Sequence, residues 1–338
     1  MTPRERMLRS LEFRRPDRVP RDIWCLPLVR LKCGSAALDA FWSRWPTDLT
    51  HAPGRTQSPG RTEGDAYAIG TYRDEWGCVF ESVQAGVIGE VKHPILEDYA
   101  KLPTLRPPLE ALELKVDEIN AFYRSSDRFV LSGCCARPFE RLQFIRGSEN
   151  LYMDIAEDSE DFRQLFKLVA DFYRREMEAW ARTDVDALMF MDDWGSQRAL
   201  LIDPAQWRRL FKPLYAEYCQ IARAAGKKIF MHTDGYVMDI YPDLIEIGVD
   251  AVNSQLFCMD LEEIGRRYKG KITFWGEIDR QHVMSSPNPE DGRRATQRVI
   301  ETLYSPEGGV IAQFELGLQL PIADAIFQTW ADLNSNPR

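Results

Sequence analysis

From about residue 127 the sequence repeats one unit, a short apolar run followed by a longer amphipathic segment. The apolar runs are RFVLSG (128–133), DALMFMDD (186–193), KKIFMH (227–232), DAVNSQ (250–255), KITFWGE (271–277) and GVIAQFE (309–315). The segments that follow them have helical spacing, as at 204–225, 237–248, 260–269, 289–303 and from about 321. Strands that alternate with helices predict a parallel sheet with helical crossovers.

The series contains neither a duplicated half nor a glycine-rich phosphate turn, which favours a closed barrel over an open nucleotide-binding sheet. We therefore predict an α/β protein with a (β/α)8 TIM barrel fold. The chain has 338 residues, of which 44% are hydrophobic, so it can form one large domain over 1–338. Residues 111–338 would supply the regular β/α units, and 1–110 an irregular elaboration that includes the first strand.

The first 110 residues contain their own signals. Thr2 and Glu5 form a capping box around Pro3, which predicts an N-terminal helix. Residues 17–24 (DRVPRDIW) predict the opening strand, and 66–83 alternate aromatic and polar residues as an antiparallel hairpin does. We expect helical and hairpin elaborations on a single barrel.

Charge and cysteine content narrow the partners and the compartment. The formal net charge is -9 and the chain has no long Lys/Arg run, so we expect neither nucleic acid nor an anionic membrane surface as a partner. No apolar run approaches the roughly 18 residues of a membrane span, and the N-terminus lacks the apolar centre of a secretory signal. Seven cysteines without a CxxC pair suit a reducing environment. We expect a cytoplasmic protein.

In a barrel enzyme the active site is built at the carboxyl ends of the strands, so the polar residues in the last part of each run or just after it are the candidates. These are Arg137 after the first run, Asp192, Asp193, Trp194 and Gln197 after the second, His232 and Asp234 after the third, Asn253 and Gln255 after the fourth, Glu277 and Asp279 after the fifth, and Glu315 after the sixth. Nearly every predicted strand ends in a group that can bind a metal, move a proton or form a hydrogen bond.

Each candidate also has an ordinary structural interpretation. Polar residues at strand ends often cap the next helix, and Asp192 and Asp193 are adjacent, so one can serve the site while the other caps. A lone buried histidine such as His232 is usually a satisfied core residue. One imidazole and several carboxylates around a single mouth nevertheless favour a divalent ion, with zinc as the first candidate. The alternative without a metal is acid-base catalysis by the carboxylates, with His232 as proton shuttle or hydrogen-bond donor.

Several stretches, in order along the chain, resemble the uroporphyrinogen decarboxylase superfamily, especially its methyltransferase-like branch. They are TPRERMLRSLEFRRPDRVP (2–20), FERLQFIRGSENLYMDI (139–155), MDDWGSQRALLIDPAQWRRLFKPLYAEYCQIARAAGKKIFMHTDG (191–235), PDLIEIGVDAVN (242–253), FWGEIDRQ (274–281) and GGVIAQFELG (308–317). The resemblance implies a (β/α)8 barrel and is compatible with a homodimer. Uroporphyrinogen decarboxylases share an arginine-rich N-terminal loop for substrate carboxylates, whereas the corresponding stretch here has only Arg30 and Lys32.

The methyltransferase branch is cobalamin-dependent and holds zinc through a His-x-Cys pair and a further cysteine near the C-terminus. By this resemblance His232 falls on the histidine, Asp234 on the first cysteine and Glu315 approximately on the last. Carboxylates thus replace two thiolates, which makes a bound ion a stronger Lewis acid toward oxygen.

We therefore expect a metal-dependent, corrinoid-linked methyltransferase or demethylase that acts on a small methoxylated or related substrate, with the corrinoid on a partner protein. The expected metal ligands are His232, Asp234, Glu315 and Glu277; the expected catalytic residues are Glu277, Asp193 and His232; the expected substrate-binding residues are Trp24, Arg137, Asp192, Trp194, Gln197, Asn253 and Gln255. Two alternatives stay open. One is a decarboxylase-like lyase or a hydrolase of a small acid, and the other is a non-catalytic barrel that binds a tetrapyrrole or corrinoid.

Overall fold

The computed structural model describes residues 1–54, 61–133 and 135–335. Its main sheet has seven parallel strands in the order β1-β5-β6-β7-β8-β9-β10. The strands are β1 (Leu49–His51), β5 (Phe129–Leu131), β6 (Ala187–Met191), β7 (Lys228–Thr233), β8 (Ala251–Ser254), β9 (Thr273–Trp275) and β10 (Val310–Ile311). The six apolar runs of the sequence therefore form six consecutive strands, β5 to β10, as predicted.

Residues 21–24 lie between β10 and β1 and close the sheet. The backbone amides of Asp22 and Trp24 donate to the carbonyls of Ala312 (3.0 Å) and Phe314 (3.1 Å), and on the other side Asp48 donates to Arg21 (2.8 Å). The predicted opening strand is thus present, but as isolated parallel bridges. The sequence did not predict β1, which is only three residues long and borders a loop rich in proline and glycine.

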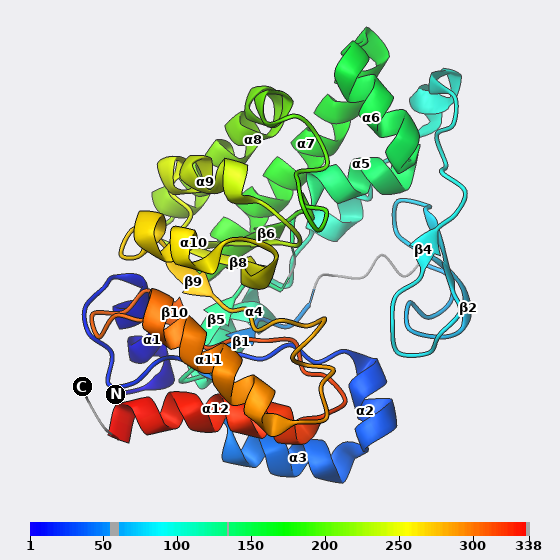
Figure 1. The fold of residues 1–338 in the computed structure, drawn as a ribbon. Helices are drawn as coiled ribbons and strands as arrows, with labels where there is room; N and C mark the ends of the chain where they lie inside the picture. Colours follow the sequence, from blue (N-terminus) through cyan, green and yellow to red (C-terminus); the bar gives the residue numbers. More distant parts are fainter. Residues whose placement is uncertain (55–60, 134, 336–338) are drawn as a thin grey trace.

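Helices surround the strands on the outside (Figure 1). They are α4 (Val116–Ser125), α5 (Pro138–Arg146), α6 (Ser148–Glu157), α7 (Glu160–Ala181), α8 (Pro204–Ala224), α9 (Tyr241–Ile247), α10 (Leu261–Tyr268), α11 (Pro289–Leu303) and α12 (Leu320–Ser335). Alternation of parallel strands and helices around a curled sheet is the TIM-barrel-like architecture that the sequence predicted. No helix among the described residues has both the length and the apolar character needed to cross a membrane.

Helix α1 (Pro3–Leu11) packs against β1, β5 and β10 at the amino-terminal end of the barrel. Its predicted capping box is confirmed, because the Thr2 hydroxyl accepts from the Glu5 amide (3.2 Å) and the Glu5 carboxylate accepts from the Thr2 amide (2.9 Å). Met7 and Leu11 join the apolar side chains of the barrel interior. Two further helices, α2 (Pro27–Cys33) and α3 (Ser35–Arg44), follow the opening segment.

The predicted hairpin is also confirmed. Strands β2 (Gly70–Arg73) and β3 (Val79–Ser82) pair antiparallel, and β4 (Glu90–Val91) adds a third strand that the sequence did not predict. This small sheet lies to one side of the barrel (Figure 1). A buried ion pair between Asp74, just after β2, and Arg141 ties it to α5.

Side chains along the barrel strands alternate between the interior and the surrounding helices. The lower interior is apolar and includes Leu49, Phe129, Leu131, Ala187, Met189, Phe230, Ala251, Trp275 and Ile311. Above this apolar layer lies a second layer, two residues further along four of the strands: Met191, His232, Asn253 and Gln313. The carboxyl and amide groups of the mouth come two residues after Trp275 and four residues after the apolar residues of the other strands: Glu277, Asp193, Asp234, Gln255 and Glu315. The polar mouth therefore stands directly on the apolar core.

Asp48 provides a test of how the barrel is closed. Its carboxylate is almost fully buried and accepts from Arg6 (2.5 Å), from Arg18 (2.8 Å) and from the Arg21 amide (2.7 Å). We expect Asp48→Ala to lower the free energy of unfolding by about 3 kcal/mol or more, because the buried Arg6 loses a counter-ion.

Urea unfolding followed by circular dichroism measures this loss. The control is Glu307→Ala, which breaks an exposed ion pair with Arg15 and should cost less than about 1 kcal/mol. Equal losses in the two variants would contradict this view of closure.

Candidate metal centre

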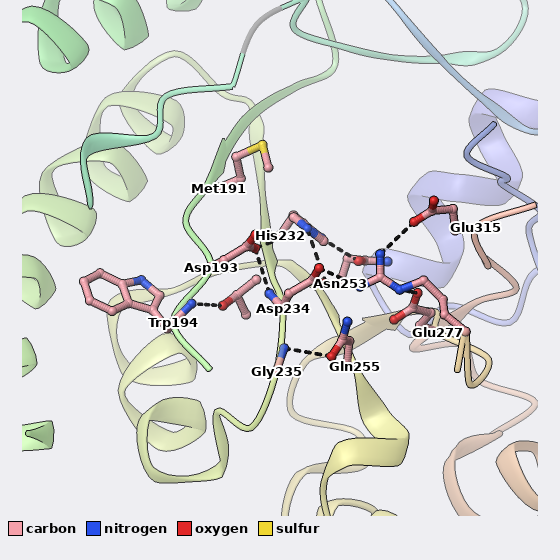
Figure 2. A network of polar contacts seen from close by, with 12 residues as sticks. Met191, Asp193, Trp194, His232, Asp234, Gly235, Asn253, Gln255, Glu277 and Glu315 are labelled. Carbon is pink, nitrogen blue, oxygen red and sulfur yellow. Dashed lines mark hydrogen bonds and ion pairs between the residues drawn. The ribbon is translucent and has the colours of Figure 1, made fainter. Parts of the chain in front are cut away.

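His232, the next-to-last residue of β7, lies at the centre of the mouth and is 5% exposed (Figure 2). Its Nδ1 is 2.7 Å from Asn253 Oδ1, and the Asn253 amide nitrogen donates to the Trp275 carbonyl and to Gln313 Oε1. Because a backbone carbonyl can only accept, Asn253 must present its oxygen to His232. Nδ1 therefore carries the proton, and Nε2 presents its lone pair to the mouth.

Two carboxylate oxygens face this lone pair. His232 Nε2 lies 3.6 Å from Asp193 Oδ1 and 3.7 Å from Asp234 Oδ1. Asp234 Oδ1 is buried and has no hydrogen-bond partner among the described residues. We call Asp193, His232 and Asp234 the triad; their ligand atoms all lie within 4.8 Å of one another.

The triad fits a metal ion. The lone pair of His232 Nε2 faces two carboxylate oxygens, of which Asp193 Oδ1 accepts from the Asp234 backbone amide (3.0 Å) and Asp234 Oδ1 has no partner among the described residues. A buried carboxylate oxygen without a partner is costly unless a cation or a proton satisfies it. Two ligand atoms each about 2 Å from a tetrahedral zinc ion are about 3.4 Å apart, close to the separations in the triad. Of the predicted metal ligands, His232 and Asp234 belong to this group, and Asp193 joins them.

Glu277 and Glu315, the other two predicted metal ligands, are instead held by an arginine that the sequence did not single out. Each nitrogen of the Arg280 guanidinium contacts a different carboxylate: Nε–Glu277 Oε1 is 2.8 Å, Nη1–Glu315 Oε2 is 2.7 Å and Nη2–Asp234 Oδ2 is 2.5 Å. Arg280 follows Glu277 by three residues in FWGEIDRQ, so the charge pattern of that stretch was the available signal.

One guanidinium shared by three carboxyl groups leaves excess negative charge around the buried Glu277. Burial raises the pKa of Glu277 to about 8; Arg280 opposes this shift, whereas Asp234 and Glu315 add to it. Burial also raises the pKa of Asp193, against the effect of His232, and Asp234 raises it further. Glu277 therefore holds a proton at neutral pH.

The motif HTDG places Asp234 by a close contact between two loops. Gly235 has a φ of 79°, which favours glycine, and a β-carbon on it would collide with the backbone of Gly195. The Gly195 amide donates to the Asp234 carbonyl (2.9 Å), and the Gly235 amide donates to Gln255 Oε1 (3.1 Å). These contacts fix the backbone on both sides of Asp234.

Several predicted substrate-binding residues lie at the mouth. Trp24 contacts His232 edge to face with ring centroids 4.8 Å apart. Gln197 and Gln255 line a small hollow of about 60 Å³ together with Cys258 and Arg280. Arg137 lies beside Met191 Sδ (3.2 Å), and Asn253 lies beneath His232 and orients it.

Asp192 and Trp194 point away from the mouth. Asp192 is fully buried and accepts from the amides of Phe139 (3.0 Å) and Glu140 (2.8 Å) at the start of α5. Trp194 stacks on Phe139 at 3.9 Å between ring centroids and donates to the Tyr215 hydroxyl (3.0 Å). Both have the opposite parity to Asp193 along the chain, so they face the helices. Of the two adjacent aspartates, Asp192 is the one that caps a helix.

Sequence reasoning also missed two residues beneath the mouth. Asp22 is a buried carboxylate that accepts from the Trp275 indole (2.9 Å), and burial raises its pKa. Gln313 accepts from Asn253. Asp22 lies inside the predicted opening strand 17–24, and Gln313 lies inside the run 309–315 before Glu315, so neither was among the residues chosen at the strand ends.

The fold and the site define a TIM-barrel-like α/β protein with a histidine-carboxylate cluster at the carboxyl ends of its strands. The family model described as uroporphyrinogen decarboxylase (URO-D) matches residues 68–323, so the chain belongs to the URO-D family. None of the curated proteins compared with the chain matches it in sequence.

Among solved structures, a methyltransferase from Methanosarcina mazei is similar over 98% of this chain and 99% of its own, with a TM-score of 0.67 and 13% identity. Two other structures are less similar. An endo-β-1,4-xylanase from Gloeophyllum trabeum is 12% identical over 63% of this chain and 79% of its own, with a TM-score of 0.40. A 3-keto-D-glucoside 4-epimerase from E. coli is 12% identical over 65% of this chain and 84% of its own, with a TM-score of 0.38. At 13% identity the likeness to the methyltransferase is one of fold.

The raised pKa of Glu277 predicts how the free energy of unfolding depends on pH. Its pKa is about 8 in the folded protein and near 4.5 when unfolded, so stability that is present below pH 4.5 is lost as pH rises toward 8. We expect Glu277→Gln to remove this loss. Between about pH 5.5 and pH 7.5 the free energy of unfolding of the variant should then fall by about 2 kcal/mol less than that of the unmodified protein.

Denaturant unfolding of metal-free protein at the two pH values checks this, with the exposed-site variant Glu307→Gln as control. Identical pH dependence in the unmodified protein and Glu277→Gln would contradict the raised pKa.

Proposed function

We propose that this URO-D family member is a metal-dependent methyltransferase that removes the methyl group of a small methoxylated substrate and passes it to a corrinoid on a partner protein. The observation that carries the proposal is the triad, in which His232 Nε2 faces two carboxylate oxygens and one of these, Asp234 Oδ1, is buried without a hydrogen-bond partner among the described residues. The M. mazei methyltransferase shares the fold of this chain over almost the whole of both chains, and the proposed reaction is of the class that its name gives.

Asp193, His232 and Asp234 would hold the ion. Their one nitrogen and two oxygen donors suit zinc or another divalent cation. Such an ion would act as a Lewis acid on the methoxy oxygen and so make that oxygen a better leaving group.

The chain's own residues have defined tasks in this proposal. Asn253 keeps the His232 lone pair directed at the mouth, and Trp24 supplies an aromatic wall beside it. When the O–CH3 bond breaks, its electron pair stays on the oxygen, and the reduced corrinoid of the partner supplies the pair for the new bond to the methyl group. The carboxyl proton of Glu277 is then available to neutralise the oxygen.

The charge of the mouth favours a small substrate that is neutral. The carboxylates of Asp193, Asp234 and Glu315 outnumber the one guanidinium of Arg280 even with Glu277 protonated, so a polyanion would be repelled. Arg30 and Lys32 on α2 are exposed. This distribution argues against an octa-carboxylate porphyrinogen.

The test is methyl transfer from a panel of aryl methyl ethers to cob(I)alamin, with protein that is first stripped of metal and then supplied with zinc. We expect transfer that depends on the metal and is lost in His232→Ala. Absence of transfer by the metal-loaded protein across the panel would contradict the proposal.

The orientation of His232 gives a further prediction. Asn253→Ala removes the acceptor that fixes the Nδ1–H tautomer, and loss of such an outer partner typically weakens metal binding by about 10–100-fold. Isothermal titration with Zn²⁺ measures the affinity. The control is Asn150→Ala, because Asn150 donates to the Arg146 carbonyl on α5 and does not take part in the hydrogen bonds of the mouth. Equal affinities for the Asn253 and Asn150 variants would contradict the assigned role.

A second candidate is a decarboxylase-like lyase or hydrolase of a small acid that works by acid-base chemistry without a metal. The observation in its favour is that Glu277 and Asp193 both have raised pKa values and so can carry protons. Elemental analysis separates the two candidates, because protein that neither retains nor binds a divalent metal would favour the acid-base reaction. A third candidate, a non-catalytic barrel, predicts spectroscopic binding of a corrinoid that His232→Ala retains.

A further inference from the structure

Arg280 stands between the triad and two carboxylates that do not belong to it. Through Nη2 it contacts Asp234, which is part of the triad, and through Nε and Nη1 it contacts Glu277 and Glu315. Its side chain is 27% exposed, whereas Glu277 beneath it is 6% exposed. The guanidinium is planar and always charged, and it can therefore bind several carboxyl groups at once. Here all three carboxyl groups contact this one cation.

The arrangement divides the carboxylate oxygens into two sets. Asp234 Oδ2 is engaged by Arg280, and Asp234 Oδ1 is the atom without a partner that faces His232. Glu277 and Glu315 direct an oxygen at the guanidinium. A divalent cation prefers the same carboxylate ligands, so Arg280 holds groups that would otherwise compete to bind the ion.

We propose that Arg280 is a positioning residue that sets the number of ligands in the metal centre. It keeps Glu277 and Glu315 out of the coordination shell and leaves Asp234 with one oxygen for the ion. This inference rests on the proposed metal site at the triad. Three protein donors then bind the ion, and a position stays open for the substrate oxygen, as in catalytic rather than structural zinc sites.

Two hollows lie beside Arg280, on the side of Glu277 and Glu315. The hollow of about 60 Å³ that Gln197 and Gln255 line has Arg280 in its wall, and so does a second hollow of about 310 Å³ lined by Glu315 and Leu318. Without Arg280, His232 and four carboxylates could close around one ion and fill its coordination shell.

Cobalt(II) is a suitable probe because its visible absorption is strong in four- or five-coordinate sites and weak in six-coordinate ones. Metal-stripped protein is titrated with Co²⁺, and affinity and absorption are both recorded. We expect one Co²⁺ per chain with strong absorption in the unmodified protein. Arg280→Ala should bind Co²⁺ about tenfold more tightly, because more anionic ligands become available, and its absorption should be several-fold weaker.

A variant that reverses the effect makes the test specific. In the triple variant Arg280→Ala, Glu277→Gln, Glu315→Gln the competing carboxylates are gone, so we expect absorption like that of the unmodified protein. Arg280→Lys keeps the positive charge but lacks the planar guanidinium that contacts three carboxyl groups, so it should give intermediate absorption. This variant replaces Arg280→Ala in the test if Arg280→Ala does not fold. The control is Arg208→Ala, because Arg208 pairs with Asp243 in contacts separate from those of the triad.

Unchanged absorption and affinity in both Arg280→Ala and Arg280→Lys would overturn this inference while the metal site stands. Weaker Co²⁺ binding in Arg280→Ala, or a triple variant that stays weakly absorbing, would overturn it as well. If the unmodified protein binds no Co²⁺, the proposed metal centre itself fails.

Discussion

The hydrogen bond between Asn253 and His232 fixes the chemistry of the mouth. Asn253 on β8 also donates to the Trp275 carbonyl on β9 and to Gln313 just after β10. One buried amide therefore connects the upper ends of β7, β8, β9 and β10. Because these acceptors leave only its oxygen for His232, the imidazole must direct Nε2 upward toward Asp193 and Asp234. The strand register supports this geometry, since His232 pairs with Asn253 across β7 and β8.

Negative charge at the mouth is the second constraint. The triad brings two carboxylates to one lone pair, and Arg280 gathers the remaining two together with the outer oxygen of Asp234. This separation explains how one small mouth accommodates so many acidic groups. In our proposal it also explains why an aspartate at position 234 is useful, because oxygen donors keep an ion strongly Lewis acidic toward an oxygen-containing substrate.

Much of this could be predicted from the sequence, because a strand-helix rhythm and strand-end polar residues are local signals. The position of the mouth followed from them, as did His232, Asp234 and the hairpin. The predictions that were wrong depended on which face of a strand a side chain points to, or on a contact between segments that are distant in the sequence. Asp192 and Trp194 face the helices because they alternate with Asp193, and β1 is too short to have a pattern of its own. Arg280 follows Glu277 by three residues, but its contacts with Asp234 and Glu315 depend on the folded path of the loop after β9, which the sequence spacing does not describe.

The most direct test of the central claim is a crystal structure of zinc-loaded protein with an anomalous-scattering map recorded at the zinc absorption edge. We predict one strong peak bounded by Asp193, His232 and Asp234, with Arg280 still paired to Glu277 and Glu315. A map without a peak at the triad, or with its peak between Glu277 and Glu315, would contradict the account.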